Sequence, residues 1–373
     1  MKRGLILSDL HLRPRVNMQG KTIEGDCEAA IESLKEFCDV IKPEFCIIAG
    51  DVFHHRTVND EELKLFGDLM NVLTEHMNQK SILVIQGNHD RGKNAIPEIC
   101  FRTTDLTDNP QKIGEWEVIG RKYIDGDDYR TYLSEIRDKY GARPAPSGES
   151  APRILVLHYP CKPFSSFSES ALKPEELDGL ADIVVVGDTH IAEKRVLNAA
   201  GATLVSPGAT LVSPGCLFPG NIDECARNNA TGCFMCILND DGSYILEKLD
   251  LYRRKYVDIR GMSYTEAVNV LTSTLKDEKL KTLVKAPRNG NYSDFESDYI
   301  FVRVSDTEDD KTAPEIAETK YTMFERIDMY VSESLKDDTD AVPVSQLIRD
   351  LIVSDEPRTI VSEFINKKLG ELE

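Results

Sequence analysis

Short apolar runs, each followed by carboxylate, amide or imidazole side chains, are the feature that most constrains this fold. Five such runs occur early in the chain, at 5–7, 45–49, 82–85, 154–157 and 183–186. The polar residues after them are Asp9, His11, Asp51, Asn88, His89, His158, Asp188 and His190. Runs this short predict buried strands, and ligands in open α/β sheets gather at the carboxyl ends of strands. We therefore expect these side chains to converge on one site.

Amphipathic helical patterns alternate with these apolar runs, and the alternation predicts an α/β sandwich. One pattern covers 26–41, with Asp26 as the expected N-cap, and a second covers 60–77. Two later strands, at 233–238 and 244–246, are joined by an Asn-Asp-Asp-Gly sequence that predicts a hairpin turn. We expect one main domain over residues 1–250.

The pattern changes after residue 250. Strands near 256–259 and 299–304, with a helix between them, predict a small β-α-β domain over residues 251–313. Residues 314–373 predict a linker and two short amphipathic helices. These helices either pack on the body of the protein or dock a partner, and the sequence leaves both interpretations open.

Composition is that of an ordinary globular protein, with 41% hydrophobic and 29% charged residues. No apolar run approaches the roughly 18 residues that span a bilayer, and the first residues do not form a signal peptide. We therefore expect a cytoplasmic protein with reduced thiols and no membrane contact. Cys216, Cys225, Cys233 and Cys236 offer a zinc site, but buried thiols are preferred because residues three apart on a strand face opposite sides.

The net charge of −19 bears on the choice of substrate. Proteins that bind nucleic acid usually present a basic surface, because neutralising phosphates supplies most of the non-specific affinity. Here 64 acidic residues face 45 basic ones. Either the substrate is small, or nucleic acid is held by local patches, bound metals and a partner. Charge alone does not decide between these alternatives.

The residue types at the strand ends suit divalent metals such as Mn²⁺, Fe²⁺ or Zn²⁺, because they combine carboxylates and imidazoles with one amide oxygen. Two such ions, roughly 3.5–4 Å apart, can hold a bridging hydroxide and clamp the attacking and leaving oxygens of a displacement. Asp51, in the central motif, is the natural bridge. Of the seven histidines, four occupy strand-end positions and two, His54 and His55, follow Asp51 closely. Each motif alone is common by chance, whereas the whole set is not.

Together these motifs resemble those of the calcineurin-like metallophosphoesterase superfamily. The residues that carry the resemblance are Asp9-Leu-His11, Gly50-Asp51-Val-Phe53-His54, Gly87-Asn88-His89-Asp90, His158 and Gly187-Asp188-Thr-His190. Within the superfamily the chain is most similar to the Mre11/SbcD nucleases, including the phage versions. The resemblance implies a four-layer α/β/β/α sandwich with a smaller capping domain and a helical C-terminal tail. For phage versions, the expected location is the host cytoplasm.

The resemblance also implies roles for individual residues. Asp9, His11 and His190 would bind one metal, and Asn88, His158 and Asp188 the other, with Asp51 bridging. His89 would stabilise the transition state or protonate the leaving oxygen, and His54 would lie near the scissile DNA. Mn²⁺ is the expected metal, with Mg²⁺ or Fe²⁺ as alternatives.

Asp188 departs from the family pattern, which has histidine at this position. A carboxylate can replace the imidazole as a ligand for Mn²⁺ or Mg²⁺, and this is the interpretation we favour. In the alternative, Asp188 orients another ligand and the second metal binds weakly.

Three functions are compatible with the sequence. The first is a two-metal DNA exonuclease and endonuclease of a repair or recombination complex, a homodimer that binds a Rad50/SbcC-type ATPase through its tail. The second is a small-substrate phosphatase or cyclic-nucleotide phosphodiesterase, which fits the negative charge more easily. The third is a binding scaffold that has lost activity, and the near-complete ligand set argues against it.

Overall fold

In the computed structural model, the chain divides into two compact units, and each is described by itself. The described residues are 1–18, 21–91, 99, 102–124, 126–140, 151–164, 170–197, 209–221, 224, 227, 229–251, 256–258, 300–306 and 322–328. The larger unit comprises Met1–Val16, Ile23–Gly220 and Arg227–Arg253, and the smaller unit comprises Asn17–Thr22, Asn221–Ala226 and Arg254–Glu373. No helix among the described residues is both long and apolar enough to cross a membrane.

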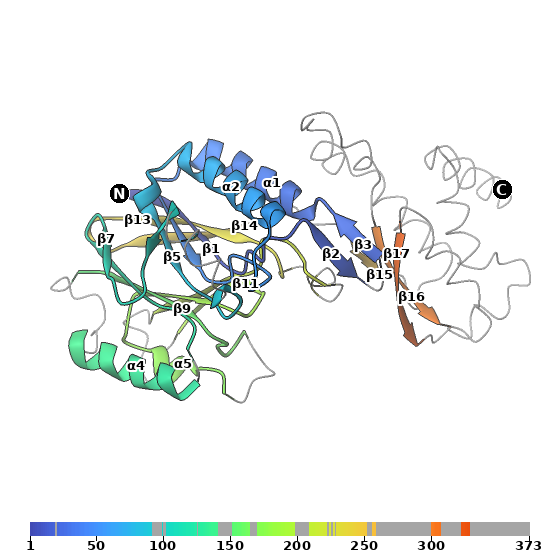
Figure 1. Cartoon of the computed structure of the whole chain (residues 1–373). Coiled ribbons are helices and arrows are strands. Elements are labelled where there is room, and N and C mark those ends of the chain that lie inside the picture. Colours follow the sequence, from blue (N-terminus) through green and yellow to red (C-terminus); the bar gives the residue numbers. More distant parts are fainter. Residues whose placement is uncertain are drawn as a thin grey trace, which may run out of the picture. The chain divides into compact units, whose positions relative to one another are not determined.

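The first sheet of the larger unit has six strands in the order β14-β13-β1-β4-β5-β6. Their bounds are β1 Lys2–Leu7, β4 Phe45–Ala49, β5 Ile82–Ile85, β6 Thr104–Asp105, β13 Cys233–Leu238 and β14 Tyr244–Leu249. β1, β4, β5 and β6 are parallel, whereas β13 and β14 form the predicted antiparallel hairpin at one side. Helices α1 (Asp26–Ile41) and α2 (Asp60–Thr74) lie along the outer face of this sheet (Figure 1).

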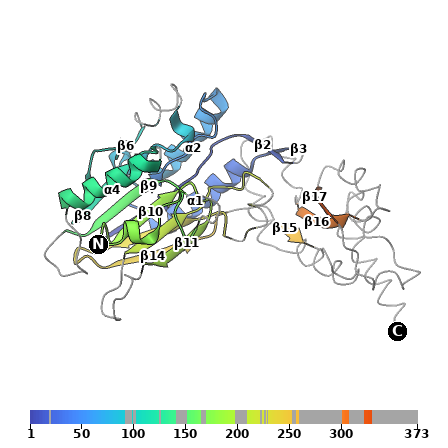
Figure 2. The same ribbon diagram turned by 90° about the horizontal axis from the view of Figure 1, so that it is seen from below.

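The second sheet also has six strands, in the order β11-β12-β10-β9-β8-β7. Their bounds are β7 Gln111–Ile113, β8 Trp116–Arg121, β9 Arg153–His158, β10 Ile183–Gly187, β11 Ala192–Val196 and β12 Thr210–Pro214. Helices α4 (Gly126–Tyr140) and α5 (Pro174–Leu177) cover the outer face of this sheet (Figures 1 and 2). Short 3-10 turns occur at Gln79–Ser81 and His89–Arg91, and β2 (Arg15–Met18) pairs with β3 (Lys21–Glu24).

Two clusters of the core lie on the two faces of the second sheet, because its central strands are buried on both sides. Ile154 and Val156 of β9 point into the layer between the two sheets, together with Trp116. Leu155 and Leu157, the alternate residues of the same strand, pack against α4. Strands covered on both sides read as continuous apolar runs, which is why the sequence predicts them as short buried segments. The expected four-layer α/β/β/α sandwich is confirmed for the larger unit.

The smaller unit contains a parallel three-stranded sheet. Its strands are β15 (Tyr256–Asp258), β16 (Ile300–Asp306) and β17 (Thr322–Asp328). The parallel pairing of β15 with β16 fits a β-α-β connection, although the predicted helix between them lies outside the described residues. β17 falls in the range that we assigned to the linker and tail, so this sheet continues past residue 313. The domain boundaries at 250 and 313 stay predictions, and the predicted tail helices lie outside the described residues.

Two features of the fold differ from the sequence expectations. Asp26 is not the N-cap of α1: Gly25, in a left-handed conformation, precedes the helix, and Asp26 is its first residue. The sequence patterns also missed β8 and α4, between the third and fourth apolar runs. Helix α4 has mostly polar residues, and tertiary packing of Tyr129 and Leu133 against the second sheet decides its position.

Gly120 and Gly67 make a matched pair for testing the packing between the sheets. A Cβ at Gly120 in β8 would lie 2.7 Å from Ile85 Cγ2 and 2.9 Å from Leu106 Cβ, whereas one at Gly67 in α2 would meet only Arg102, at 3.9 Å. Gly120→Ala should lower the free energy of unfolding by about 1–3 kcal/mol through overpacking. Gly67→Ala should raise it by about 0.5–1 kcal/mol, because alanine favours helix.

The single tryptophan allows this comparison within the larger unit. Trp116 is buried between the sheets and its indole N–H donates to the Asn239 carbonyl at 2.9 Å. Its fluorescence during urea unfolding therefore reports the core that Gly120 contacts. Equal urea midpoints for the two variants would contradict close packing at Gly120.

Candidate metal centre

The structure brings the predicted strand-end residues to one end of both sheets. In the first sheet, β1 leads to Asp9 and His11, β4 to Asp51, and β5 to Asn88 and His89. In the second sheet, His158 is the last residue of β9, and β10 leads to Asp188 and His190. The parallel strands β1, β4, β5, β9 and β10 supply all of them, because parallel strands end at the same edge of a sheet.

The backbone at these strand ends is strained in a consistent way. Asp9, His11, Asp51, Asp188 and His190 all have positive φ, at 49°, 41°, 51°, 72° and 46°. Residues with a Cβ rarely adopt this left-handed region, and such strain concentrates at functional sites. Hydrogen bonds between neighbouring strand ends hold the conformation: Asp9 N donates to Gly50 O at 3.0 Å, and His11 N to Asp51 O at 2.9 Å.

Glycines beside the site are required for two different reasons. Gly50 has a φ of +91°, a left-handed conformation that glycine adopts without strain. Gly87 is needed for room, because a Cβ there would lie 2.0 Å from Asp51 Oδ1. Gly187 is likewise needed for room, because a Cβ would lie 2.4 Å from His158 Nδ1. At Gly87 and Gly187 the close approach of neighbouring strand ends therefore forces the choice of glycine.

A first group of candidate ligand atoms surrounds the Nε2 atoms of two histidines. His11 Nε2 lies 3.1 Å from His190 Nε2 and 3.6 Å from Asp51 Oδ2, and His190 Nε2 lies 3.6 Å from Asp9 Oδ1. Ligand atoms that bind one ion at about 2.1 Å lie roughly 3–4 Å apart, so this spacing fits one divalent ion. Asp9, His11 and His190 also have ligand atoms within 4.8 Å of one another.

A second group surrounds His158. Its Nε2 lies 3.0 Å from the Asn88 amide oxygen, 3.4 Å from Asp51 Oδ2 and 3.9 Å from Asp188 Oδ1. The same Asp51 oxygen therefore faces both groups, which is the position that a bridging ligand needs. Asp188 contributes its carboxylate to the second group, and its backbone N–H donates to Asp9 at 3.0 Å.

Hydrogen bonds leave the correct atoms of this second group available to a cation. His158 Nδ1 lies 2.7 Å from the Ala49 carbonyl, so Nδ1 carries a proton and the neutral ring presents the Nε2 lone pair. The Asn88 amide atom that faces His158 also lies 3.1 Å from Asp51 Oδ2. As an oxygen, it faces only other acceptors, an arrangement that a cation between them would stabilise.

Buried negative charge explains the electrostatics of the centre. Burial, aided by the nearby charges of Asp9 and Asp51, raises the pKa of Asp188 to about 6. Burial also raises the pKa of Asp9. Burial opposes protonation of His158, yet the Asp51 carboxylate outweighs it and holds the pKa of His158 well above its usual value. The metal-free centre thus retains protons, which divalent ions displace when they bind. The donor set, its spacing and its charge all fit two such ions.

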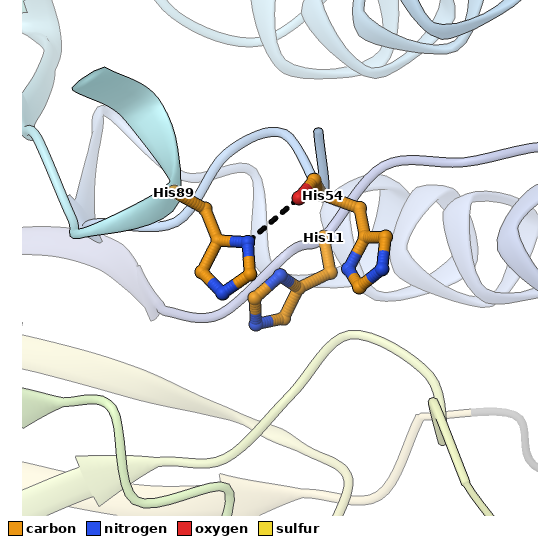
Figure 3. Close-up of side chains that lie close together, drawn as sticks. All are labelled: His11, His54 and His89. Carbon is orange, nitrogen blue, oxygen red and sulfur yellow. Dashed lines mark hydrogen bonds between the residues drawn. The ribbon is translucent and has the colours of Figure 1, made fainter. Parts of the chain in front are cut away.

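Three imidazoles, which form one side of the centre, lie close together in Figure 3. The ring centroid of His11 lies 4.9 Å from that of His89 and 5.4 Å from that of His54. His89 Nδ1 donates to the His54 carbonyl at 2.6 Å, so Nε2 is the atom of His89 that is available for chemistry. His55 pairs instead with Glu62 at 2.6 Å.

The structure adds residues to which the sequence analysis assigned no role. Asp90 is fully buried, and its carboxylate accepts backbone N–H bonds from Val52 and Gly87 through Oδ2 and from Phe53 through Oδ1. These bonds join the ends of β4 and β5. Although burial raises the pKa of Asp90 to about 6, these three bonds favour the ionised form. The position of Asp90 directly after Asn88 and His89 was the sequence signal that could have identified it.

Two hydroxyl groups support the centre from further away. The Ser8 hydroxyl lies 2.7 Å from Asp9 Oδ2, and the Tyr129 hydroxyl of α4 donates to the His158 carbonyl at 3.1 Å. Tyr129 therefore links the outer helix to a predicted ligand, a contact that no local pattern encodes. Cys216, Cys233 and Cys236 are buried, and Cys225 lies outside the described residues.

Comparison with known proteins gives one relative by sequence and several by structure. The chain is 29% identical over 143 residues to the DNA double-strand break repair protein Mre11 of Nanoarchaeum equitans, which covers 36% of this chain and 37% of that protein. The chain therefore matches little more than a third of that relative's length. Solved structures with similar folds include the calcineurin-like phosphoesterase YfkN of Bacillus subtilis, at 11% identity and a TM-score of 0.37 over 76% of this chain and 99% of that one. A phosphoesterase of E. coli, Yfce, matches at 15% identity and a TM-score of 0.31, over 67% of this chain and 100% of that one.

The family assignment rests on the catalytic half of the sequence. The family model described as calcineurin-like phosphoesterase matches residues 3–192, which is more than half of the 373 residues and includes every residue of the centre. Members of this family are metal-dependent hydrolases of phosphoesters, and the two groups of ligand atoms fit that chemistry. The chain belongs to the calcineurin-like phosphoesterase family.

Proposed function

We propose that this phosphoesterase is a two-metal DNA nuclease, with exonuclease and endonuclease activity, that acts in DNA repair or recombination. The main support for two metal ions is one oxygen of Asp51. This Oδ2 atom lies 3.6 Å from His11 Nε2 and 3.4 Å from His158 Nε2. The likeness to the DNA double-strand break repair protein Mre11 supports DNA as the substrate.

In this proposal each side chain has a separate task. Asp9, His11 and His190 hold one divalent ion, Asn88, His158 and Asp188 hold the other, and Asp51 binds both. When bound, the two ions lower the pKa of a water nucleophile and withdraw charge from the phosphate. Mn²⁺ is the ion that we propose, because a mixed oxygen and imidazole set with three carboxylates suits it.

His89 is the residue that we assign to proton transfer. Its Nδ1 proton is committed to the His54 carbonyl, so the proton for the leaving oxygen comes from Nε2 of the doubly protonated imidazolium ring. This assignment separates His89 from the ligands, because its Nε2 serves the substrate. His54 lies beside His89, with a ring separation of 5.5 Å, and we place it next to the scissile phosphate.

Metal content and activity should respond differently to two substitutions. His89→Asn should lower the rate of phosphodiester hydrolysis by about 10²–10⁴-fold and leave two Mn²⁺ ions per chain, because it removes a proton donor and no ligand. Asp188→Ala should reduce the metal content to one ion per chain. The measurement is mass spectrometry of metals after equilibration with Mn²⁺, alongside hydrolysis of bis(4-nitrophenyl) phosphate.

His76→Asn is the matched control, because His76 lies outside the centre and pairs with Asp39 at 3.1 Å. This variant should retain both activity and metal. Loss of metal from His89→Asn would assign His89 as a ligand instead. Two ions retained by Asp188→Ala would favour the alternative in which Asp188 only orients a ligand.

A direct test of the substrate compares DNA with small phosphodiesters. With Mn²⁺, the protein should degrade end-labelled duplex DNA, and EDTA should abolish the reaction because both ions are removed. The second candidate is a phosphatase or cyclic-nucleotide phosphodiesterase, which the net charge of −19 favours. Rapid turnover of cyclic nucleotides without cleavage of DNA would select that candidate.

We also propose that the chain forms a homodimer and binds a Rad50/SbcC-type ATPase through its C-terminal tail. The support is the Mre11 likeness and the amphipathic pattern of the last residues, such as Val344, Leu347 and Leu351. Deleting residues 341–373 should abolish co-sedimentation with a purified ATPase of this type and leave basal hydrolysis unchanged. Retained binding would place the docking surface elsewhere.

A further inference from the structure

Arg13 approaches the three-imidazole side of the centre just after the Asp9–His11 motif. Its Nη1 lies 2.6 Å from His54 Nε2, and its Nη2 donates to the Gly220 carbonyl at 3.3 Å. The guanidinium carbon lies 5.9 Å from the centre of the Phe218 ring. Arg13 is thus held between His54 and the segment after β12, and it has a defined position relative to the imidazole.

The bond from Arg13 determines which nitrogen of His54 carries the proton. A guanidinium has only donors, so His54 Nε2 must accept, and the ring must be neutral with its proton on Nδ1. Burial and the charge of Arg13 agree with a neutral ring, since they lower the pKa of His54 to about 3. Without such a partner, a neutral histidine in water favours the proton on Nε2.

The Nδ1 atoms of His54 and His11 are both buried and have no hydrogen-bond partner among the residues that the structure describes. In His11 the Nε2 atom faces His190 and Asp51, so Nδ1 points away from the proposed metal. One nitrogen from each of His11, His54 and His89 lies within 4.8 Å of the other two. Figure 3 shows the three rings around this common space.

Two buried N–H groups without acceptors are costly, and an anionic oxygen would satisfy both. A hydrogen bond of this kind spans about 2.9 Å, so one oxygen can accept from two neighbouring rings, and the ring centroids of His11 and His54 lie 5.4 Å apart. Charge-assisted bonds to a phosphate oxygen are also stronger than bonds between neutral groups. The space therefore fits an oxygen that the substrate brings.

We propose that Arg13 is a positioning residue that holds His54 with its proton on Nδ1, so that His54 and His11 together bind a non-bridging oxygen of the substrate phosphate beside His89. The tautomer follows from the Arg13 contact alone, whereas the phosphate as the bound group rests on the proposed hydrolysis of phosphodiesters. Arg13 acts through His54 and does not itself touch the reacting atoms.

Nuclear magnetic resonance of ¹⁵N-histidine-labelled protein tests the tautomer without any substrate. The chain has only seven histidines, and His54→Gln identifies the signals of His54 by their loss. With the diamagnetic ion Mg²⁺ present, we expect His54 to show a protonated Nδ1 and an unprotonated Nε2. Arg13→Met should move the proton to Nε2, and Arg13→Lys, which retains a donor, should preserve the original pattern.

Hydrolysis of bis(4-nitrophenyl) phosphate tests the role in the reaction. Arg13→Met should lower kcat at least about tenfold and change KM less, because the donors act mainly on charge that develops in the transition state. Arg13→Lys should restore most of kcat. In a His54→Gln background, Arg13→Met should have little further effect, because the two residues act as one unit.

The outcomes separate this inference from the proposed nuclease function. A proton on His54 Nε2 in the unaltered protein, or an unchanged tautomer in Arg13→Met, would overturn the positioning role. An altered tautomer with unchanged kcat, or additive effects of the two substitutions, would overturn the phosphate contact. Failure to cleave DNA would affect neither readout, since both use a small phosphodiester or no substrate. A Trp116 urea midpoint equal to that of the unaltered protein excludes misfolding of Arg13→Met.

Discussion

The burial of three carboxylates around one imidazole is the constraint on which the rest of this structure depends. Asp9, Asp51 and Asp188 share a centre with His158, and like charges in a low-dielectric environment repel strongly. The chain compensates with donors from its own backbone, including Asp188 N to Asp9 and His89 N to Asp51 at 2.9 Å. Cations supply the remaining compensation, either as protons or as divalent ions. The charge that binds metal is therefore also the charge that the fold must hold in place.

Two sheets packed face to face make this concentration of charge possible. The apolar layer between them fixes the ends of β1, β4, β5, β9 and β10 at one edge. Five residues there occupy left-handed conformations, and each such conformation costs about 1–3 kcal/mol. Asp90 joins two strand ends through three backbone bonds, and Gly87 lets Asp51 approach. A rigid core thus stabilises a strained edge.

The two sides of the centre have different chemistry. On one side, carboxylates, Asn88 and the Nε2 atoms of three histidines offer lone pairs to cations. On the other side, Arg13 donates to His54 Nε2, so His54 offers its Nδ1 proton, and His89 Nδ1 donates to the His54 carbonyl. The lone pairs that can hold cations and the N–H donors therefore lie on opposite sides of His11. This arrangement suits an anionic phosphate better than a neutral substrate. Local positive charge of this kind also eases the conflict between a net charge of −19 and the nucleic-acid substrate that we propose.

The sequence alone determined the α/β architecture, the strands that lead to the centre and the set of polar residues at their ends. These follow from local rules, since doubly buried strands require apolar runs and a metal site requires particular donor atoms. Only the tertiary structure decided that one Asp51 oxygen faces both ligand groups, that Gly87 and Gly187 are needed for room, and that Arg13 sets the proton of His54. Helix α4 and its Tyr129 contact with His158 were also beyond the sequence. Such features depend on distances between segments far apart in the chain, which the periodicity of a single segment does not encode.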